Sequence, residues 1–472
     1  MRRLSLIIFR FEWQQLTRRL VPVIAMVCFV LMGSYSLYNG SAFTKRQLQG
    51  IDSIEQHFLE HRSALLNRFQ ADTTTKEGKL MAVQAGIPQV VEYRNPPYTV
   101  FPPSRLSALA IGQRDLLPYF DIITSKRNDL TSSRTEIINP EQLAAGNLDF
   151  SFVFIYLFPL LLVVWGYDVY SGEAEQQTEK LLAVQGAALK PVLAFKLLFR
   201  VGCVCIIAWA LSIAGFGIHR IAGMSFADGL YWLGGITLYL VFWGMLVWLV
   251  ILGGKSSHVT LIRLVGIWFS LTFLFPAIAY ETVEVIYPVP SHTALISDQR
   301  EEVEQTWEIP VGELLDIYYE NNPQYVSLRS PSDTAQYGNR RFVAYYDLLD
   351  RRIRKHAEDY NHRADRHYDM LDRLGWVSPV LQMQTSLNTV ARTGPDDFAA
   401  YREQVSDYRD EWVSHMNRFM LHNRKLKPAD IAELPLFTFH EIPGRANRVF
   451  RSVWPVFLWT LILFFLSKRK TL

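Results

Sequence analysis

One short pattern in the sequence contains residues that could carry out hydrolytic chemistry. In the segment HFLEH, His57 and His61 are four residues apart and would share one face of a helix, where two imidazoles can bind zinc. Glu60 would then be placed to act as a general base. No third ligand can be identified. We therefore interpret the segment as a solvated polar helix face and keep a zinc site at His57, Glu60 and His61 as the alternative.

A second pattern, GGKSS at 253–257, has the last residues of a P-loop, the glycine-rich loop that binds phosphate. A P-loop also needs a glycine that would fall at position 249, which is Leu249. The segment follows a long uncharged run instead of a strand. We interpret it as a tight turn, and we expect neither bond chemistry nor a cofactor in this chain.

Other residues that could bind metals or undergo redox reactions are scattered. The spacing of His356, His362 and His367 does not bring them to one helical face, so we expect them on a solvated helix surface. The cysteines are Cys28, Cys203 and Cys205. All three fall in uncharged runs, where we expect small buried side chains and no disulfide.

Charge is distributed in blocks along the 472 residues, although the net charge is only +3. A helix crosses a bilayer with about 17–25 apolar residues. We predict six transmembrane helices at 20–40, 150–167, 199–218, 230–252, 264–280 and 450–467. This pattern excludes a purely soluble protein. The small net charge gives no reason to expect a nucleic-acid partner, and the absence of a charge in the centre of any span disfavours an ion-coupled carrier.

Two long charged stretches, 41–149 and 281–449, separate these runs and are long enough to fold. Apolar residues recur at three- and four-residue steps from Leu48 to Phe69, from Tyr346 to Leu374 and from Phe398 to Phe419, which predicts helices. Short strands are predicted near Val90–Tyr93 and Phe437–Ile442. The expected fold is mainly α, a six-helix transmembrane bundle with a large, mostly helical extracytoplasmic domain formed by the two inserts.

Basic residues predict the orientation of the chain. They are concentrated in four short segments, 1–19, 168–198, 253–263 and 468–472, which fall on one side if the six helices alternate. Such loops remain in the cytoplasm. We therefore expect a multi-pass cytoplasmic (inner) membrane protein with both termini inside and both inserts outside, or periplasmic. The segment 1–19 is expected to be an amphipathic helix on the membrane, with Leu4, Ile7, Ile8 and Phe11 on its apolar side.

The segment between the second and third spans, Ser171–Arg200, resembles a signature of ABC-2 type transporter permeases. The matching residues are Glu173, Glu175, Thr178, Leu181 and Leu182, with Lys196 before the next span. The family usually has Gly before the threonine, where this chain has Gln177. Trp376–Trp412, Asn321–Tyr325 and Leu434–Pro443 are similar to the branch with large extracytoplasmic inserts, which includes the nitrous-oxide-reductase maturation permease.

This resemblance implies a permease subunit without its own nucleotide site. Its implied partners are a P-loop ATPase subunit that binds ATP and Mg, a second permease subunit that is identical or a sister chain, the lipid bilayer and a protein outside the membrane. The resemblance assigns the ATPase-coupling interface to Glu173, Glu175, Thr178, Glu179, Lys180 and Leu182. Lesser contacts are assigned to Arg10, Lys255 and Ser256.

The sequence is also compatible with two other functions. A non-transporting membrane scaffold or sensor would use the outer helices to bind a partner and would work without an ATPase. A membrane-anchored metallopeptidase would use His57, Glu60 and His61 and would contain stoichiometric zinc.

Overall fold

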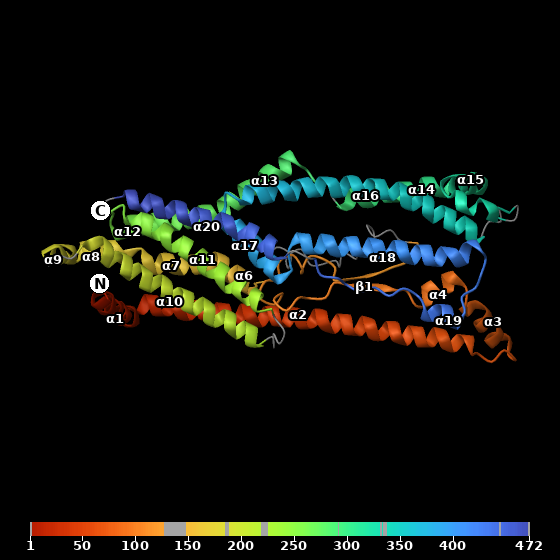
Figure 1. Cartoon of the computed structure of the whole chain (residues 1–472), viewed down its shortest axis with the longest axis horizontal. Coiled ribbons are helices and arrows are strands. Elements are labelled where there is room, and N and C mark those ends of the chain that lie inside the picture. The colour runs from red at the N-terminus through yellow and green to blue at the C-terminus, as the bar shows by residue number, and fades with distance from the viewer. Residues whose placement is uncertain are drawn as a thin grey trace.

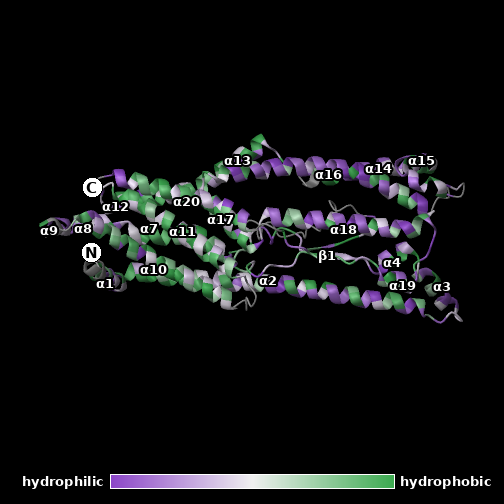
Figure 2. Ribbon diagram, in the orientation of Figure 1, coloured by the Kyte–Doolittle hydropathy of each residue, from purple (hydrophilic) through white to green (hydrophobic). Residues whose placement is uncertain are grey.

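The chain folds into a long, mainly helical molecule (Figure 1). The computed structural model describes residues 2–126, 148–184, 188–218, 225–290, 292–330, 333, 338–442 and 445–470. Half of the length is apolar and half is polar (Figure 2). The two ends of the chain lie near each other at the end of the apolar half that is farther from the polar half. The predicted mainly α fold is therefore confirmed.

Six helical segments in the described residues are long and apolar enough to cross a membrane, as the uncharged runs predict. They are Leu20–Phe69 (α2), Phe150–Glu175, Leu189–Gly217, Phe226–Ile251 (α11), Ser257–Ile286 and Ala446–Arg469. The third and sixth belong to the helices Leu189–Ile218 (α10) and Arg445–Arg469 (α20). Each segment extends beyond its uncharged run, because a helix continues until a cap or a breaking residue ends it.

Two of the six segments contain a wider π-helical turn. The first consists of Phe150–Phe152 (α6), the π turn Val153–Leu157 (η1), Phe158–Gly166 (α7) and Asp168–Glu175 (α8). The other consists of Ser257–Phe269 (α12), the π turn Ser270–Leu274 (η2) and Phe275–Ile286 (α13). Each π turn ends in the same tripeptide, Leu-Phe-Pro, at 157–159 and 274–276. Proline has no N–H to donate to the preceding turn, so the regular series of backbone hydrogen bonds along the helix is interrupted there.

Side chains from neighbouring helices bond to carbonyl groups of the first π turn. The Tyr239 hydroxyl donates to the Ile155 carbonyl at 2.8 Å, and the Trp268 indole N–H donates to the Tyr156 carbonyl at 2.9 Å. In an apolar bundle an unpaired carbonyl is costly, so these two donors stabilise the irregular segment.

The core of the apolar half surrounds α11. Its side chains Trp232, Tyr239 and Trp243 are fully buried and pack with residues of α7, α10 and α20. A helix from the second charged stretch, Pro379–Ala391 (α17), adds Met383 and Leu387 to the same core. The bundle is therefore closed by a segment that lies outside the six apolar helices.

The polar half has a separate core to which both long charged stretches contribute. It contains the far end of α2 and the helices Pro88–Arg94 (α4), Val311–Asn321 (α15), Asn339–Gly375 (α16), Pro395–Leu421 (α18) and Pro428–Ala432 (α19). Three further elements belong to this half, Lys76–Ala85 (α3), His292–Trp307 (α14) and the 3₁₀ helix Pro323–Leu328 (η3). The helices predicted from apolar periodicity are confirmed.

The predicted strands are wrong. Residues 90–93 lie in α4, where Pro88 starts a helix that buries Val91. Residues 437–442 form no strand, and the His440 backbone bonds to the Gln404 side chain instead. The described strands are instead Tyr98–Val100 (β1) and Phe120–Ile122 (β2), which pair antiparallel. β1 lies in the proline-rich segment NPPYTVFPPS at 95–104, between its two Pro-Pro pairs, and its Tyr, Thr and Val residues favour a strand.

The helix α2 joins the two halves without a break. Its 50 residues extend about 75 Å at 1.5 Å per residue. Near its middle the backbone of a loop approaches so closely that a Cβ at Gly40 would lie 1.9 Å from the Ala108 carbonyl oxygen. Arg114 of the same loop region donates to the Phe101 carbonyl at 2.6 Å. Burial lowers the pKa of Arg114 to about 10, so this side chain is still charged at neutral pH.

We predict that Gly40→Ala lowers the free energy of unfolding by about 1–3 kcal/mol, because the added methyl group meets backbone that cannot move aside easily. Thermal unfolding of the chain in lipid nanodiscs measures the change. The control is Gly234→Ala in α11, where a Cβ would meet nothing within 4 Å. Equal melting temperatures for the two variants would contradict the close contact.

Candidate functional site

Several polar elements meet at the end of the apolar half that is farther from the polar half (Figure 1). They are α8, the helices Arg2–Arg18 (α1) and Thr178–Val184 (α9), the start of α10, and the turn before α12. The resemblance predicts one cytoplasmic coupling helix at 168–198. The structure has two short helices there, α8 and α9, followed by the first turns of α10. Residues 185–187, where a turn near Gly186 is expected, lie outside the described residues.

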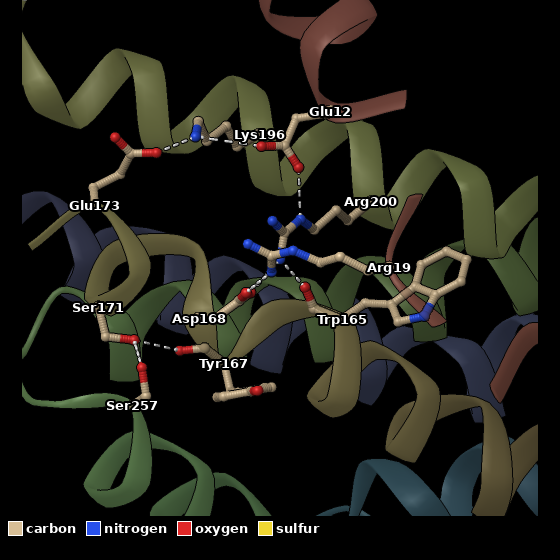
Figure 3. A network of polar contacts seen from close by, with 10 residues as sticks. All are labelled: Glu12, Arg19, Trp165, Tyr167, Asp168, Ser171, Glu173, Lys196, Arg200 and Ser257. Atoms are coloured by element: carbon tan, nitrogen blue, oxygen red, sulfur yellow. Dashed lines mark hydrogen bonds and ion pairs between the residues drawn. The ribbon is translucent and has the colours of Figure 1, made fainter. Parts of the chain in front are cut away.

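A chain of six side chains with alternating charge runs through this end of the bundle (Figure 3). In order they are Glu173, Lys196, Glu12, Arg200, Asp168 and Arg19. The Lys196 ammonium bonds to the Glu173 carboxylate and lies 3.3 Å from Glu12 Oε1, within ion-pair range but outside hydrogen-bond geometry. Glu12 and Lys196 are only 1% and 6% exposed.

Arg200 is the central member of the chain. Its Nε donates to Glu12 Oε2 at 2.8 Å, and its Nη1 donates to Asp168 Oδ1 at 2.5 Å. The same Nη1 bonds to the Trp165 carbonyl at the end of α7. Arg19, at the junction of α1 and α2, reaches the second oxygen of Asp168 at 2.5 Å. One guanidinium on α10 thus contacts α1, α7 and α8.

The charges of these six side chains balance, with three carboxylates and three cations. Removing such groups from water costs several kcal/mol each, and the cost is offset only where each charge has well-placed opposite partners. The four inner members each have two. Arg19, at one end, has a 41% exposed side chain. The six side chains therefore form a single ionic network whose inner members depend on one another.

Glu173 connects this network to α9. Its carboxylate accepts a bond from the Thr178 hydroxyl at 2.5 Å, and the same hydroxyl donates to the Glu173 backbone carbonyl at 3.1 Å. Between the two residues the chain turns sharply, with Gln177 at φ 58° in the left-handed region. Glycine adopts this conformation without a steric penalty, whereas other residues do so at a cost.

A second link joins α8 to α12. The Ser257 backbone N–H donates to the Glu175 carboxylate at 3.0 Å, and the Ser257 hydroxyl lies 2.7 Å from the Ser171 hydroxyl. The first N–H groups of a helix have no partner within the helix, so the carboxylate satisfies one of them. The turn 253–257 is tight, with Gly254 at φ 58°.

The predicted interface residues differ in how far they are exposed. Glu173 and Thr178 bond to each other within the bundle end, whereas the exposed Glu175 caps α12. On α9, Glu179 is half-buried and Lys180 is exposed, and the side chain of Leu182 lies outside the described residues. The lesser contacts Arg10, Lys255 and Ser256 are all exposed.

The first helix packs one face against the bundle and leaves much of the side that is expected to lie on the membrane exposed. Ile8, Glu12 and Leu16 are buried, while Ile7 and Phe11 are more than half exposed. Hydropathy assigns a glutamate to the solvent side, so the sequence gives no signal that Glu12 is buried. Its partner Arg200 is 188 residues away. The resemblance marks Lys196, whereas Arg200 and Asp168 could have been indicated only as charges next to an uncharged run.

The histidine pattern on α2 lies on an exposed face of the helix. His57 and Glu60 have side chains 68% and 57% exposed, and their nearest charged atoms are 3.6 Å apart. The rings of His57 and His61 are 6.4 Å apart. Among the described residues, no group of three or more His, Cys, Asp and Glu side chains is arranged to hold a metal ion.

One expectation about the other histidines is wrong. His367 is buried at 4% exposure, where its Nδ1 bonds to the Tyr287 carbonyl at 3.0 Å, because α13 packs across α16 at this position. His356 lies on the same helix and is more exposed, 3.1 Å from Glu302. The three cysteines are unpaired, and Cys28 is exposed instead of buried.

We predict that Arg200→Met lowers the free energy of unfolding by about 3–5 kcal/mol, because it leaves buried carboxylates without their partner. Arg19→Met removes an exposed member of the same chain and should cost about 0–1 kcal/mol. Thermal unfolding and the yield of monodisperse protein in nanodiscs measure both. Equal losses for the two variants would contradict the role of Arg200 as the central member.

We predict that Gln177→Gly slows amide hydrogen exchange in α9, because glycine removes a left-handed penalty of about 1–2 kcal/mol from the turn. The matched control is Gln176→Gly at φ −86°, where glycine only adds chain entropy and should speed exchange. Changes in the same direction for both variants would contradict the strained turn.

A family model described as "Domain of unknown function (DUF3526)" matches residues 293–440, which is less than half of the chain. The matched region extends from α14 past α19 in the polar half and includes α17, which packs into the core of the bundle. No curated protein and no solved structure matches the chain.

Proposed function

We propose that this chain is the membrane-spanning permease subunit of an ABC-2 type transporter. The six apolar helices form its transmembrane unit, and the polar half lies outside the cytoplasm. Separate P-loop ATPase subunits bind ATP and Mg, and a second permease subunit completes the assembly. The chain itself carries out no bond chemistry.

The observation that carries the proposal is the position of α9. This short helix projects beyond the rest of the bundle end (Figure 1), and its last described side chain, Val184, is 87% exposed. It contains the threonine and the leucine pair of the signature that resembles the permease family. The left-handed turn at Gln177 falls where that family usually has glycine, which supports the resemblance.

Contacts within the bundle end provide a route for force. Thr178 at the start of α9 bonds to Glu173, and from there the ionic network continues to Glu12 on α1 and Arg200 on α10. A push on α9 by a closing ATPase would therefore act on α8, α1 and α10 at once. Such a push changes the conformation only if the partner contacts the two states with different affinity.

The distribution of basic residues supports the proposed orientation. Basic residues are concentrated in segments at the end of the apolar half that is farther from the polar half. They are Arg18, Arg19, Lys180, Lys255 and the cluster from Lys468 to Lys470. Positive residues in short loops remain in the cytoplasm. That end would face the ATPases, and the polar half would face the other compartment.

The proposal is tested by purifying the tagged full-length chain from its native membranes. We expect a soluble P-loop subunit and Mg-dependent ATP hydrolysis to co-purify with it. The double variant Glu175→Lys, Glu179→Lys should lose both by about tenfold or more, because it reverses the charge offered beside α9. The control variant Glu301→Lys, Glu308→Lys carries the same charge change on exposed residues of the polar half and should retain both.

Unchanged elution and melting temperature of both double variants show that the fold is intact. Purified wild-type chain that retains its own function without any P-loop subunit or ATP hydrolysis would contradict the permease proposal and favour a scaffold or sensor. If the Glu175→Lys, Glu179→Lys variant still co-purifies with the P-loop subunit, the interface assignment is contradicted.

A further inference from the structure

A cavity of about 290 Å³ lies in the polar half between α14, α16 and α18. On α14 it is lined at positions 296, 299, 300 and 303, and on α16 at positions 346, 349, 350 and 353. Both sets have the i, i+3, i+4, i+7 spacing of one helix face, so two helix stripes face each other across the space. Its volume is near the lower end of the range of small-ligand sites.

Gln299 is the unusual residue of the lining. It is only 3% exposed, yet neither its amide nitrogen nor its amide oxygen has a hydrogen-bond partner among the described residues. A buried amide without partners is costly, and native structures rarely retain one. Its side chain offers one acceptor and an N–H donor side by side, the complement of a peptide unit.

The neighbouring walls are apolar. Ile296 and Val303 of α14 face Leu349 and Ile353 of α16 across the cavity. These side chains offer no hydrogen bonds, so they favour an aliphatic group beside the Gln299 amide. Deeper in the lining, Arg409 and Asp350 are 2.8 Å apart and already form an ion pair.

Positive charge predominates among the more exposed residues of the lining. Lys126 and Arg300 are both exposed, and Glu304 is the one carboxylate beside them among the exposed described residues of the cavity. The Lys126 ammonium lies over the Phe342 ring, 5.4 Å from its centroid. Two cations next to an apolar space suit a ligand that ends in a carboxylate.

We propose that this cavity binds the C-terminal end of a short apolar peptide. The Gln299 side chain turns toward the cavity and its amide pairs with a peptide unit. An aliphatic side chain packs between α14 and α16, and the terminal carboxylate lies between Lys126 and Arg300. The proposal is independent of the permease role, because the cavity lies in the polar half and shares no residue with the ionic network.

The test uses the full-length chain in phosphatidylcholine nanodiscs, which avoids detergent entering the cavity. The probe is the tripeptide acetyl-Val-Leu-Leu with a free carboxylate, titrated by calorimetry against its C-terminal amide. We expect saturable binding of one peptide per chain and about tenfold or more weaker binding of the amide form. The same tripeptide fused to the end of a small carrier protein distinguishes a free oligopeptide from a protein tail as the ligand.

Two variants test the site itself. Val303→Trp fills the space from a half-exposed position, and Gln299→Leu removes the amide at similar volume, so each should weaken binding by about tenfold or more. The control Val326→Trp lies at a similarly exposed position in η3, outside the lining, and should bind as the wild type does.

The melting temperature without peptide separates a ligand site from a structural role of the amide. Gln299→Leu should melt at the same temperature as the wild type or higher, because it removes an unpaired buried polar group. A lower melting temperature would overturn the proposal, as would absent saturable binding or wild-type affinity in both cavity variants.

Discussion

The guanidinium of Arg200 determines how one end of the bundle is assembled. Apolar helices that cross a membrane associate through van der Waals packing and hydrogen bonds more than through the hydrophobic effect, so buried polar contacts have a strong influence on their relative positions. Arg200 makes such contacts with Glu12, with Asp168 and with the Trp165 carbonyl, which belong to three other helices. We infer that α1, α8 and α10 keep their mutual arrangement because any displacement would separate buried charges.

The two halves of the molecule are stabilised by different physical effects. The apolar half relies on packed aromatic side chains of α11 and on donors that satisfy its irregular π turn. The polar half folds around a hydrophobic core of its own, built from both long charged stretches. The helix α2 contributes to both cores, and α17, from the second charged stretch, packs into the core of the apolar half, so neither half is an independent appendage of the other.

Sequence reasoning predicted the elements that depend on local composition. The six apolar helices follow from uncharged runs, and the amphipathic helices of the polar half follow from their periodicity. It failed where distant residues decide the structure. The burial of Glu12 on α1 could not be predicted, because its partner Arg200 is 188 residues away. The strand predicted at 90–93 is wrong because Pro88 starts a helix there. The exposures of Glu173 and Glu175 could not be inferred from spacing either.

The unbroken length of α2 has a mechanical consequence. An uninterrupted helix carries a tilt of its base to its tip, and this one extends from the apolar end to the far end of the polar half. Because it rises 1.5 Å per residue, a tilt of about 5° at its base would displace its tip by roughly 6 Å. We infer that a small tilt of the helices beside the base of α2 would be amplified into a larger displacement at its opposite end.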